Sequence, residues 1–350
     1  MQKHKRTFAS DNYAGICPEA WESMQEANSV HAPAYGADEY TEKACNMIRD
    51  LFETECEVFF AFNGTASNSL SLASMCRSYH SIVCHDLAHI ETDECGAIEF
   101  FSGGTKLLKV SGKNGKVAPA GIEHMVHRRS DIHYPKPRVL SITQATEVGT
   151  VYSVDEMSEL GALTHGLGLK VHMDGARFAN AIASLKCAPK DITWKAGVDV
   201  LCFGGTKNGL AVGEAIVFFN RDLAKEFDYR CKQAGQLASK MRFLAAPWLG
   251  MLKTGAWLKN AETANARAKL LEKGLKAIPE VKMNYPTQVN SVFVTMNPKL
   301  VEALYERGWH FYDFIAGGGA RLMCSWDTTE EDINEFVADV TELAPQFGKA

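Results

Sequence analysis

The chain has 350 residues, of which 46% are hydrophobic and 23% charged, and its formal net charge is −5. This composition is typical of a globular protein and excludes a disordered one. Because the chain is mildly acidic and has no long run of Lys or Arg, we expect no binding to nucleic acid. Its apolar runs have the length of strands, well short of the roughly 20 residues that cross a bilayer, so we expect no membrane association.

The ten cysteines are scattered along the chain, and none of them forms a C-x-x-C pair. Several, such as Cys84 and Cys202, lie within apolar, strand-like runs. This pattern favours buried free thiols over disulfides or a structural zinc site. We therefore expect a cytoplasmic protein without a bound metal.

Short apolar runs alternate with longer helical stretches through the first two-thirds of the chain, which predicts an α/β fold. Strands are predicted at residues 57–62, 81–84, 105–110, 138–142, 169–173, 198–203 and 214–219. Helical crossovers between them imply a seven-stranded, mostly parallel sheet flanked by helices. Only ten residues separate positions 203 and 214, too few for a helical crossover, so the seventh strand should run antiparallel to the sixth.

Beyond residue 220 the pattern is helical to about residue 275. Strands at 290–296 and 320–326 and a helix at 329–343 then predict a smaller α+β unit. We therefore expect a large domain, residues 1–250, and a small C-terminal domain, residues 251–350.

The segment Asn63-Gly64-Thr65 follows the first predicted strand and precedes a predicted helix. Free N–H groups at a helix start, a glycine turn and a hydroxyl together suit a bound phosphate. The same residue types are also ordinary helix N-caps, so that alternative stays open. Neither the dinucleotide fingerprint nor the P-loop motif occurs.

The segment His172-Met-Asp174-Gly-Ala-Arg177 closes the fifth predicted strand. At that edge the side chain of Asp174 would face a ligand. A carboxylate beside a pyridine nitrogen keeps that nitrogen protonated. The alternative is that Asp174 only caps the following helix. Lys207 lies in an uncharged glycine-rich turn between the last two strands, a setting that suits a nucleophilic amine. Most lysines are instead solvated surface residues.

His85 and His89 are spaced four residues apart, as in some helical metal sites. They follow a strand directly, however, and no matching third ligand appears. A loop that places one histidine beside a cofactor is the favoured interpretation.

Taken in chain order, several motifs resemble the pyridoxal-phosphate threonine aldolases of the aspartate-aminotransferase fold, fold type I. They are Ser10-Asp11-Asn12, Tyr35-Gly36-x-Asp38, Asn63-Gly-Thr-Ala66, Ala88-His89, His172-x-Asp-Gly-Ala-Arg177, Gly205-Thr-Lys207 and Ala320-Arg321. In detail, Gln144-Ala-Thr-Glu-Val-Gly149 and Gly235-Gln-Leu-Ala-Ser-Lys-Met-Arg242 resemble the bacterial low-specificity L-threonine aldolases.

The resemblance implies pyridoxal 5'-phosphate as the cofactor, held covalently by Lys207. Asp174 would pair with the pyridine nitrogen, and His89 would stack on the ring. The phosphate would be held by Gly64, Thr65, Thr206 and Arg242.

The resemblance also implies an amino-acid substrate whose carboxylate would bind to Ser10, Arg177 and Arg321. Arg177 would contact the cofactor as well. Tyr35 would reach in from a neighbouring subunit. The implied assembly is a homotetramer whose active sites are shared across a dimer interface.

The implied reaction is retro-aldol cleavage of L-threonine, L-allo-threonine and other β-hydroxy-α-amino acids to glycine and an aldehyde. Relatives with a Thr-His-Asn-Gly turn place a histidine where this chain has Glu147. His89 and Glu147 are therefore the two candidate bases, and we expect His89 to contribute more to catalysis. The alternatives are a phenylserine-type aldolase, an aminotransferase or a β-eliminating lyase, and a binding module that needs no Lys207.

Overall fold

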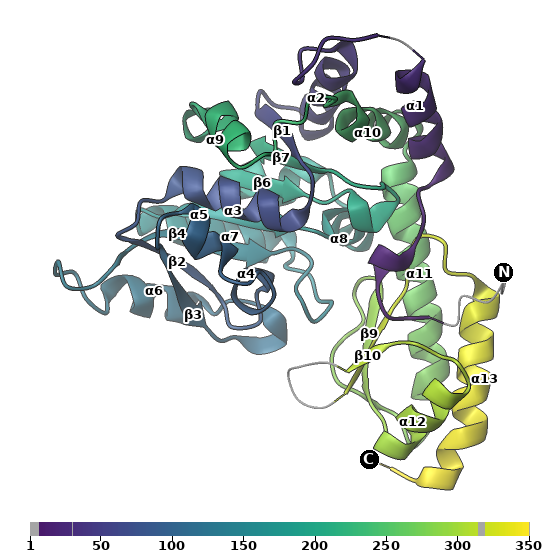
Figure 1. The fold of residues 1–350 in the computed structure, drawn as a ribbon. Coiled ribbons are helices and arrows are strands. Elements are labelled where there is room, and N and C mark those ends of the chain that lie inside the picture. The colour runs from purple at the N-terminus through teal and green to yellow at the C-terminus, as the bar shows by residue number, and fades with distance from the viewer. Residues whose placement is uncertain (1–6, 30, 314–318, 350) are drawn as a thin grey trace.

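The computed structural model describes residues 7–29, 31–313 and 319–349, and its larger part is a seven-stranded sheet covered by helices (Figure 1). The strand order is β1-β7-β6-β5-β4-β2-β3. The strands are β1 (Glu57–Ala61), β2 (His80–His85), β3 (Lys106–Val110), β4 (Lys136–Thr143), β5 (Lys170–Gly175), β6 (Val200–Phe203) and β7 (Glu214–Phe218). All seven predicted strands are thus confirmed. The seventh, β7, pairs antiparallel with both β1 and β6, as the short connection requires.

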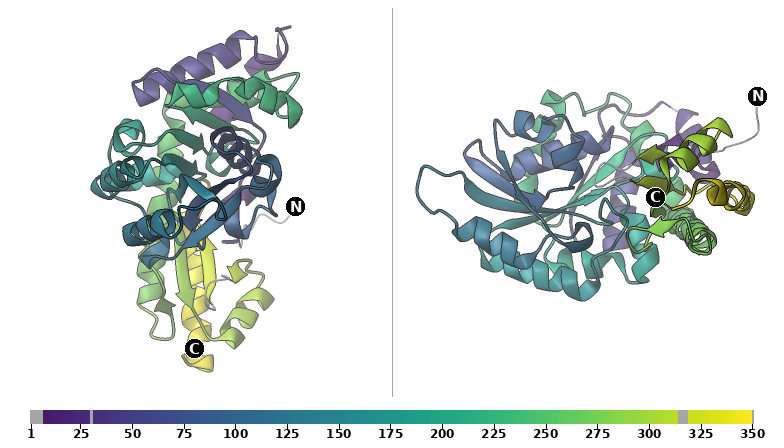
Figure 2. Two further views of the ribbon diagram at one scale, coloured as in Figure 1. Left: turned by 90° about the vertical axis from the view of Figure 1, so that its left-hand side faces the viewer. Right: turned by 90° about the horizontal axis from the view of Figure 1, so that it is seen from below.

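Helices lie on both faces of this sheet, as the view from below shows (Figure 2). Every residue of β6 and β7 is consequently buried, which explains why both strands are apolar apart from Glu214 at the start of β7. The helices of the larger part are α1 (Pro18–Asn28), α2 (Glu39–Phe52), α3 (Gly64–Met75), α4 (His89–Thr92), α5 (Ala97–Phe101), α6 (Pro119–His127), α7 (Val154–Gly166), α8 (Phe178–Leu185), α9 (Phe227–Gln233) and α10 (Arg242–Thr254). Short 3₁₀ turns include η1 (Asp11–Tyr13) and η5 (Thr206–Asn208).

The smaller part is an antiparallel sheet of order β10-β11-β9-β8 packed against helices. Its elements are β8 (Lys282–Met283), β9 (Ser291–Thr295), α12 (Pro298–Glu306), β10 (Tyr312–Asp313), β11 (Ala320–Met323) and α13 (Glu330–Phe347). The strands β9 and β11 and the helix α13 were predicted. The edge strands β8 and β10 were not, because two residues are too few to show an alternating pattern.

The helix α11 (Ala256–Lys276) contributes to both hydrophobic cores. Its first half, with Trp257, packs in the core of the large sheet, whereas Leu271 packs in the core of the small one. The N-terminal segment joins the small core through Phe8, whose N–H donates to the carbonyl of His310 at 2.7 Å. Both α11 and the N-terminal segment connect the two parts, so the division into domains at residue 250 stays a prediction.

All ten cysteines are free, and Cys84 and Cys202 are buried as predicted. Burial raises the pKa of the Cys84 thiol to about 12. Within residues 7–29, 31–313 and 319–349, no helix combines the length and apolarity needed to cross a bilayer.

Candidate active site

Two adjoining hollows open at the carboxyl edge of the large sheet, where β5, β6 and the start of α3 meet. Both are lined by Asn12, His89 and Lys207. Their volumes are about 240 and 470 Å³. The first is further lined by the predicted Gly64, Thr65, Asp174 and Thr206, and the second by the predicted Ser10, Glu147, Arg177 and Arg321. Most residues selected from the sequence therefore meet in one place.

Lys207 lies in the turn η5, whose main chain is fixed by surrounding amides. Asn208 donates to the carbonyl of Trp257 at 2.6 Å, and Asn260 donates to the carbonyl of Asn208 at 3.0 Å. The N–H of Gly205 donates to the buried Glu214 at 2.7 Å. Within the part of the chain that the structure describes, Lys207 forms no ion pair, so its amine is available to a ligand.

Asp174 ends β5 and is only 5% exposed. Its Oδ1 accepts from the N–H of Ala176 at 3.0 Å, and its Oδ2 accepts from Nδ2 of Asn68 at 3.0 Å. These bonds fix a buried carboxylate that faces the first hollow, as a protonated pyridine nitrogen requires.

His172 points to the same side of β5 as Asp174 but lines neither hollow. It is fully buried, with Nδ1 at 2.9 Å from the Ser141 hydroxyl and Nε2 at 3.3 Å from Sγ of Cys202. Burial lowers its pKa to about 4, so its role is a neutral structural one.

His89 begins α4, and its Nδ1 lies 2.9 Å from Oε1 of Glu94. The hydrogen bond to Glu94 is the largest cause that raises the pKa of His89. His85, by contrast, accepts from the N–H of Leu87 at Nδ1 and donates from Nε2 to the carbonyl of Gly112. The two histidines thus have separate partners, and no group of three or more potential metal ligands occurs among the described residues.

The start of α3 supplies the predicted anion cup. Asn63 caps the helix through Oδ1, which accepts from the N–H of Ala66 at 2.9 Å. The N–H groups of Gly64 and Thr65 precede the first intrahelical hydrogen bonds and remain available to a ligand. Thr206 lines the same hollow, and its Oγ1 is buried and has no well-formed partner among the described residues. This donor set fits a phosphate.

Arg177 is part of a buried ion pair that the sequence analysis missed. Its Nε and Nη2 donate to the two carboxylate oxygens of Asp11 at 2.7 and 2.9 Å. Burial acts to raise the pKa of Asp11, but Arg177 and Lys207 together lower it below its ordinary value. Asp11 therefore orients Arg177 at the wall of the second hollow. The motif Ser10-Asp11-Asn12 was noticed in the sequence, but nothing local indicated its partner.

Arg321 lies on β11 and lines the second hollow without a carboxylate partner among the described residues. Its Nη2 donates to the carbonyl of Ala9 at 3.3 Å, and its Nε is buried without a partner there. Burial, and then the charge of Arg177, lower its pKa. A buried guanidinium that lacks a carboxylate partner is a binding site for an anion such as a substrate carboxylate.

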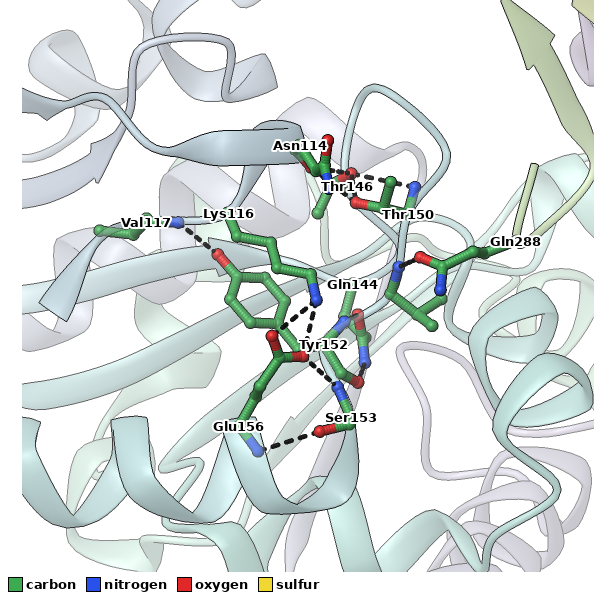
Figure 3. Close-up of polar contacts among 11 residues, drawn as sticks. Asn114, Lys116, Val117, Gln144, Thr146, Thr150, Tyr152, Ser153, Glu156 and Gln288 are labelled. Atoms are coloured by element: carbon green, nitrogen blue, oxygen red, sulfur yellow. Dashed lines mark hydrogen bonds and ion pairs between the residues drawn. The ribbon is translucent and has the colours of Figure 1, made fainter. Parts of the chain in front are cut away.

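Glu147 is the partly exposed residue of a loop, residues 144–152, whose other members are buried. The amide of Gln144 spans the loop, accepting from the N–H and donating to the carbonyl of Tyr152 at 3.0 and 2.9 Å (Figure 3). The hydroxyls of Thr146 and Thr150 lie 2.8 Å apart, and Thr150 donates to the carbonyl of Asn114. The loop is therefore rigid and presents Glu147 to the second hollow.

Tyr35 and Arg242 do not line either hollow of their own chain. Tyr35 is 50% exposed, and Nζ of Lys232 lies 4.6 Å from its ring centroid. Arg242 donates from Nε to the carbonyl of Ala27 at 3.1 Å. Their roles at the partner's substrate and at the phosphate stay predictions.

Comparisons with known proteins agree with this geometry. The family model described as beta-eliminating lyase matches residues 7–298. The low specificity L-threonine aldolases of a Pseudomonas species and of Pseudomonas aeruginosa are each 60% identical to this chain over 97% of its length and 98% of theirs. The chain belongs to the low-specificity L-threonine aldolase family.

A solved structure of a threonine aldolase from Leishmania major superimposes with a TM-score of 0.91 and 28% identity, covering 97% of this chain and 99% of that one. The enzyme is thus a pyridoxal-phosphate-dependent carbon–carbon lyase of fold type I. The residues of the first hollow fit this cofactor: Lys207 is unpaired within the described chain, the carboxylate of Asp174 is fixed, and Thr206 adds a hydroxyl to the wall.

Proposed function

We propose that this enzyme cleaves L-threonine and L-allo-threonine to glycine and acetaldehyde, and other β-hydroxy-α-amino acids to glycine and the matching aldehyde. The observation that supports this most directly is the adjacency of the two hollows. The first holds Lys207 and Asp174, and the second holds Arg177, Arg321 and Glu147. An amino acid bound across them has its carboxylate at the arginines and its β-hydroxyl near His89 or Glu147.

Pyridoxal phosphate, when bound, draws off the electron pair released at the substrate α-carbon. Lys207 would hold it covalently, Asp174 would keep its ring nitrogen protonated, and His89 would pack against the ring. Gly64, Thr65 and Thr206 would bind its phosphate, with Arg242 as a further contributor. Each assignment is supported by the lining of the first hollow except that of Arg242.

Arg177 and Arg321, with Ser10, bind the substrate carboxylate and so fix the rotation about the α-carbon. This rotation would select the Cα–Cβ bond for cleavage, because the orientation of the bound substrate decides which bond of the α-carbon is aligned to break. His89 accepts the proton of the β-hydroxyl at Nε2, and Glu147 orients that hydroxyl. As this proton leaves, the oxygen becomes a carbonyl, the Cα–Cβ bond breaks and the aldehyde departs; a proton taken up at the α-carbon then completes glycine.

We propose further that the enzyme is a cytoplasmic homotetramer with active sites shared across a dimer interface. Free cysteines support a reducing compartment. Phe62, which lines the first hollow, is 55% exposed, and Tyr35 is 50% exposed, so a second chain could cover both rings. Sedimentation of the purified protein tests the assembly, and a monomer that keeps full activity contradicts it.

A product assay tests the reaction. Holoenzyme supplied with L-threonine, L-allo-threonine or phenylserine should release glycine and aldehyde in equal amounts. Keto acid formed without glycine would instead indicate an aminotransferase, and ammonia with keto acid a β-eliminating lyase. A clear preference for phenylserine would indicate the phenylserine-type aldolase.

A further inference from the structure

Glu94 lies behind the active site and contacts two elements that line it. It is 3% exposed and lines neither hollow. Its Oε1 lies 2.9 Å from Nδ1 of His89 and accepts from Nδ2 of Asn68 at 2.8 Å. The same Asn68 nitrogen donates to Oδ2 of Asp174 at 3.0 Å.

The hydrogens of this cluster can be assigned from its chemistry. A carboxylate only accepts, so the proton between Glu94 and His89 belongs to Nδ1 of the ring. In neutral His89 the lone pair is then on Nε2. An amide NH₂ has two hydrogens, and Asn68 uses one for Glu94 and the other for Asp174.

A continuous chain of hydrogen bonds therefore runs from the histidine on the ring face to the carboxylate of the ring nitrogen. Asn68 itself comes from α3, the helix whose first turn forms the anion cup. Three elements of the site, α3, α4 and β5, are thus fixed relative to one another by two buried side chains.

We propose that Glu94 is a positioning residue of the reaction, which acts through His89 by holding the Nδ1–H tautomer and leaving Nε2 as the proton acceptor. Asn68 donates a hydrogen bond to each of the carboxylates of Glu94 and Asp174 and so fixes their relative position. This inference rests on the proposed function and specifies which of its two candidate bases has a dedicated partner. Glu147 has no such hydrogen-bonded partner among the described residues.

The charged groups that face His89 come from several elements. They are Asp93, whose Oδ2 lies 3.4 Å from Nε2, together with Glu94, Glu147, Asp174 and Lys207. The side chain of Asp93 is 80% exposed, so solvent screens its charge. Glu94 has a fully buried side chain and makes the shortest contact of the group with the ring.

The variant Glu94→Gln removes the charge and keeps the shape. The matched control is Glu91→Gln, because Glu91 lies on α4, the helix that begins with His89, but pairs with Lys109 at 2.8 Å. Labelling the histidine rings and titrating full-length, cofactor-free protein by NMR gives the ionisation of His89, with His89→Asn to assign its signal. In Glu94→Gln the midpoint of His89 should move to lower pH, and in Glu91→Gln it should stay.

The holoenzymes give a second measurement. In Glu94→Gln the rising limb of kcat against pH should move to lower pH, and the plateau should fall at least tenfold because the histidine is a weaker base. Glu94→Asp keeps the charge and should retain more of the wild-type pH profile, which separates the charge from a packing effect.

An unchanged His89 midpoint together with a wild-type pH profile in Glu94→Gln would overturn the proposal. An identical change in Glu94→Asp and Glu94→Gln would do the same. If the wild-type holoenzyme cleaves no β-hydroxy amino acid, the proposed function fails, and the titration still reports separately on the Glu94–His89 pair.

Discussion

Asp11 and Arg177 form a bidentate ion pair, with Arg177 Nε and Nη2 at 2.7 and 2.9 Å from the two oxygens of Asp11. The pair joins the N-terminal segment to the start of α8, which Arg177 precedes, and Asn290 of the smaller part also donates to Asp11 at 3.1 Å. One buried carboxylate thus connects three regions of the chain at the wall of the substrate hollow.

Replacing Asp11 with Asn should destabilise the protein, because it leaves the buried charge of Arg177 without its partner. Breaking a buried pair on one side typically costs about 3–5 kcal/mol. The pKa of Asp11 in the folded protein lies below its ordinary value of 3.8. The ionised carboxylate therefore stabilises the fold fully above pH 3.8, and this stabilisation is lost as the pH falls through the folded-state pKa.

Urea unfolding checks this prediction. The difference between wild type and Asp11→Asn should be constant near neutral pH and should shrink below pH 3.8. Asp131→Asn, which removes the exposed partner of Arg129, is the control and should change stability little. Equal stability of wild type and Asp11→Asn at pH 7 would contradict the prediction.

Lys207 should carry the cofactor, because its amine is unpaired within the described chain and faces both hollows. Borohydride reduction of the yellow holoenzyme should fix the pyridoxyl group on the peptide that contains Lys207, as read by mass spectrometry. Lys225→Ala, an exposed lysine paired with Asp222, should leave the labelling unchanged. A label on another lysine would disprove the assignment.

Asp174→Asn should keep the fold and nearly abolish turnover, because an amide cannot stabilise a protonated pyridine. Asp199 is a useful comparison: it is also buried beside β5, where it accepts from the N–H of Val171 at 2.9 Å, but it lines neither hollow. Asp199→Asn should therefore lower the melting temperature more than the turnover of the folded enzyme. Near-normal turnover of Asp174→Asn would show that the ring nitrogen need not be charged.

Arg321→Ala should weaken cleavage about ten- to hundredfold while the bound cofactor keeps its colour. A charged hydrogen bond contributes roughly 1.5–3 kcal/mol, which corresponds to this range. Steady-state kinetics with L-threonine and the absorption spectrum of the holoenzyme measure the two effects. Loss of colour together with activity would mean that Arg321 supports the cofactor or the fold instead.

Sequence reasoning located the parts of the site that depend on local pattern. The seven strands follow from alternation of apolar and helical segments, and the reversal of β7 follows from the length of one loop. Asp174 was selected because it ends a strand, and Lys207 because it lies in an uncharged glycine-rich turn, both at the edge where parallel sheets bind ligands; the structure places both in the lining of the first hollow.

The parts that depend on distant contacts were not predicted. Asp11 pairs with a residue 166 positions away, and Asn68 reaches Asp174 across 106 positions. Nothing in the local sequence around Glu94 distinguishes it from the exposed Asp93 beside it. The expected roles of Tyr35 and Arg242 depend on contacts beyond a single chain, with a neighbouring subunit and a bound phosphate.

The identity of the base is decided by comparing His89→Asn with Glu147→Gln. The buried carboxylate of Glu94 holds His89 and raises the pKa of its ring. The ring therefore accepts a proton readily, and it becomes neutral only as the pH rises through this raised pKa. Glu147 sits on a rigid loop and influences His89, Arg177 and Arg321 through its charge. We expect His89→Asn to impair both cofactor binding and turnover, the latter by a factor of about 100 or more.

Glu147→Gln, in contrast, should retain a substantial rate and change mainly the ratio of threonine to allo-threonine cleavage. It should also move the rising limb of kcat to lower pH, because removing a negative charge near His89 makes the ring less basic. The measurement is kcat against pH for both variants on both substrates. If Glu147→Gln is inactive with its cofactor bound while His89→Asn keeps most of its rate, the two roles are reversed.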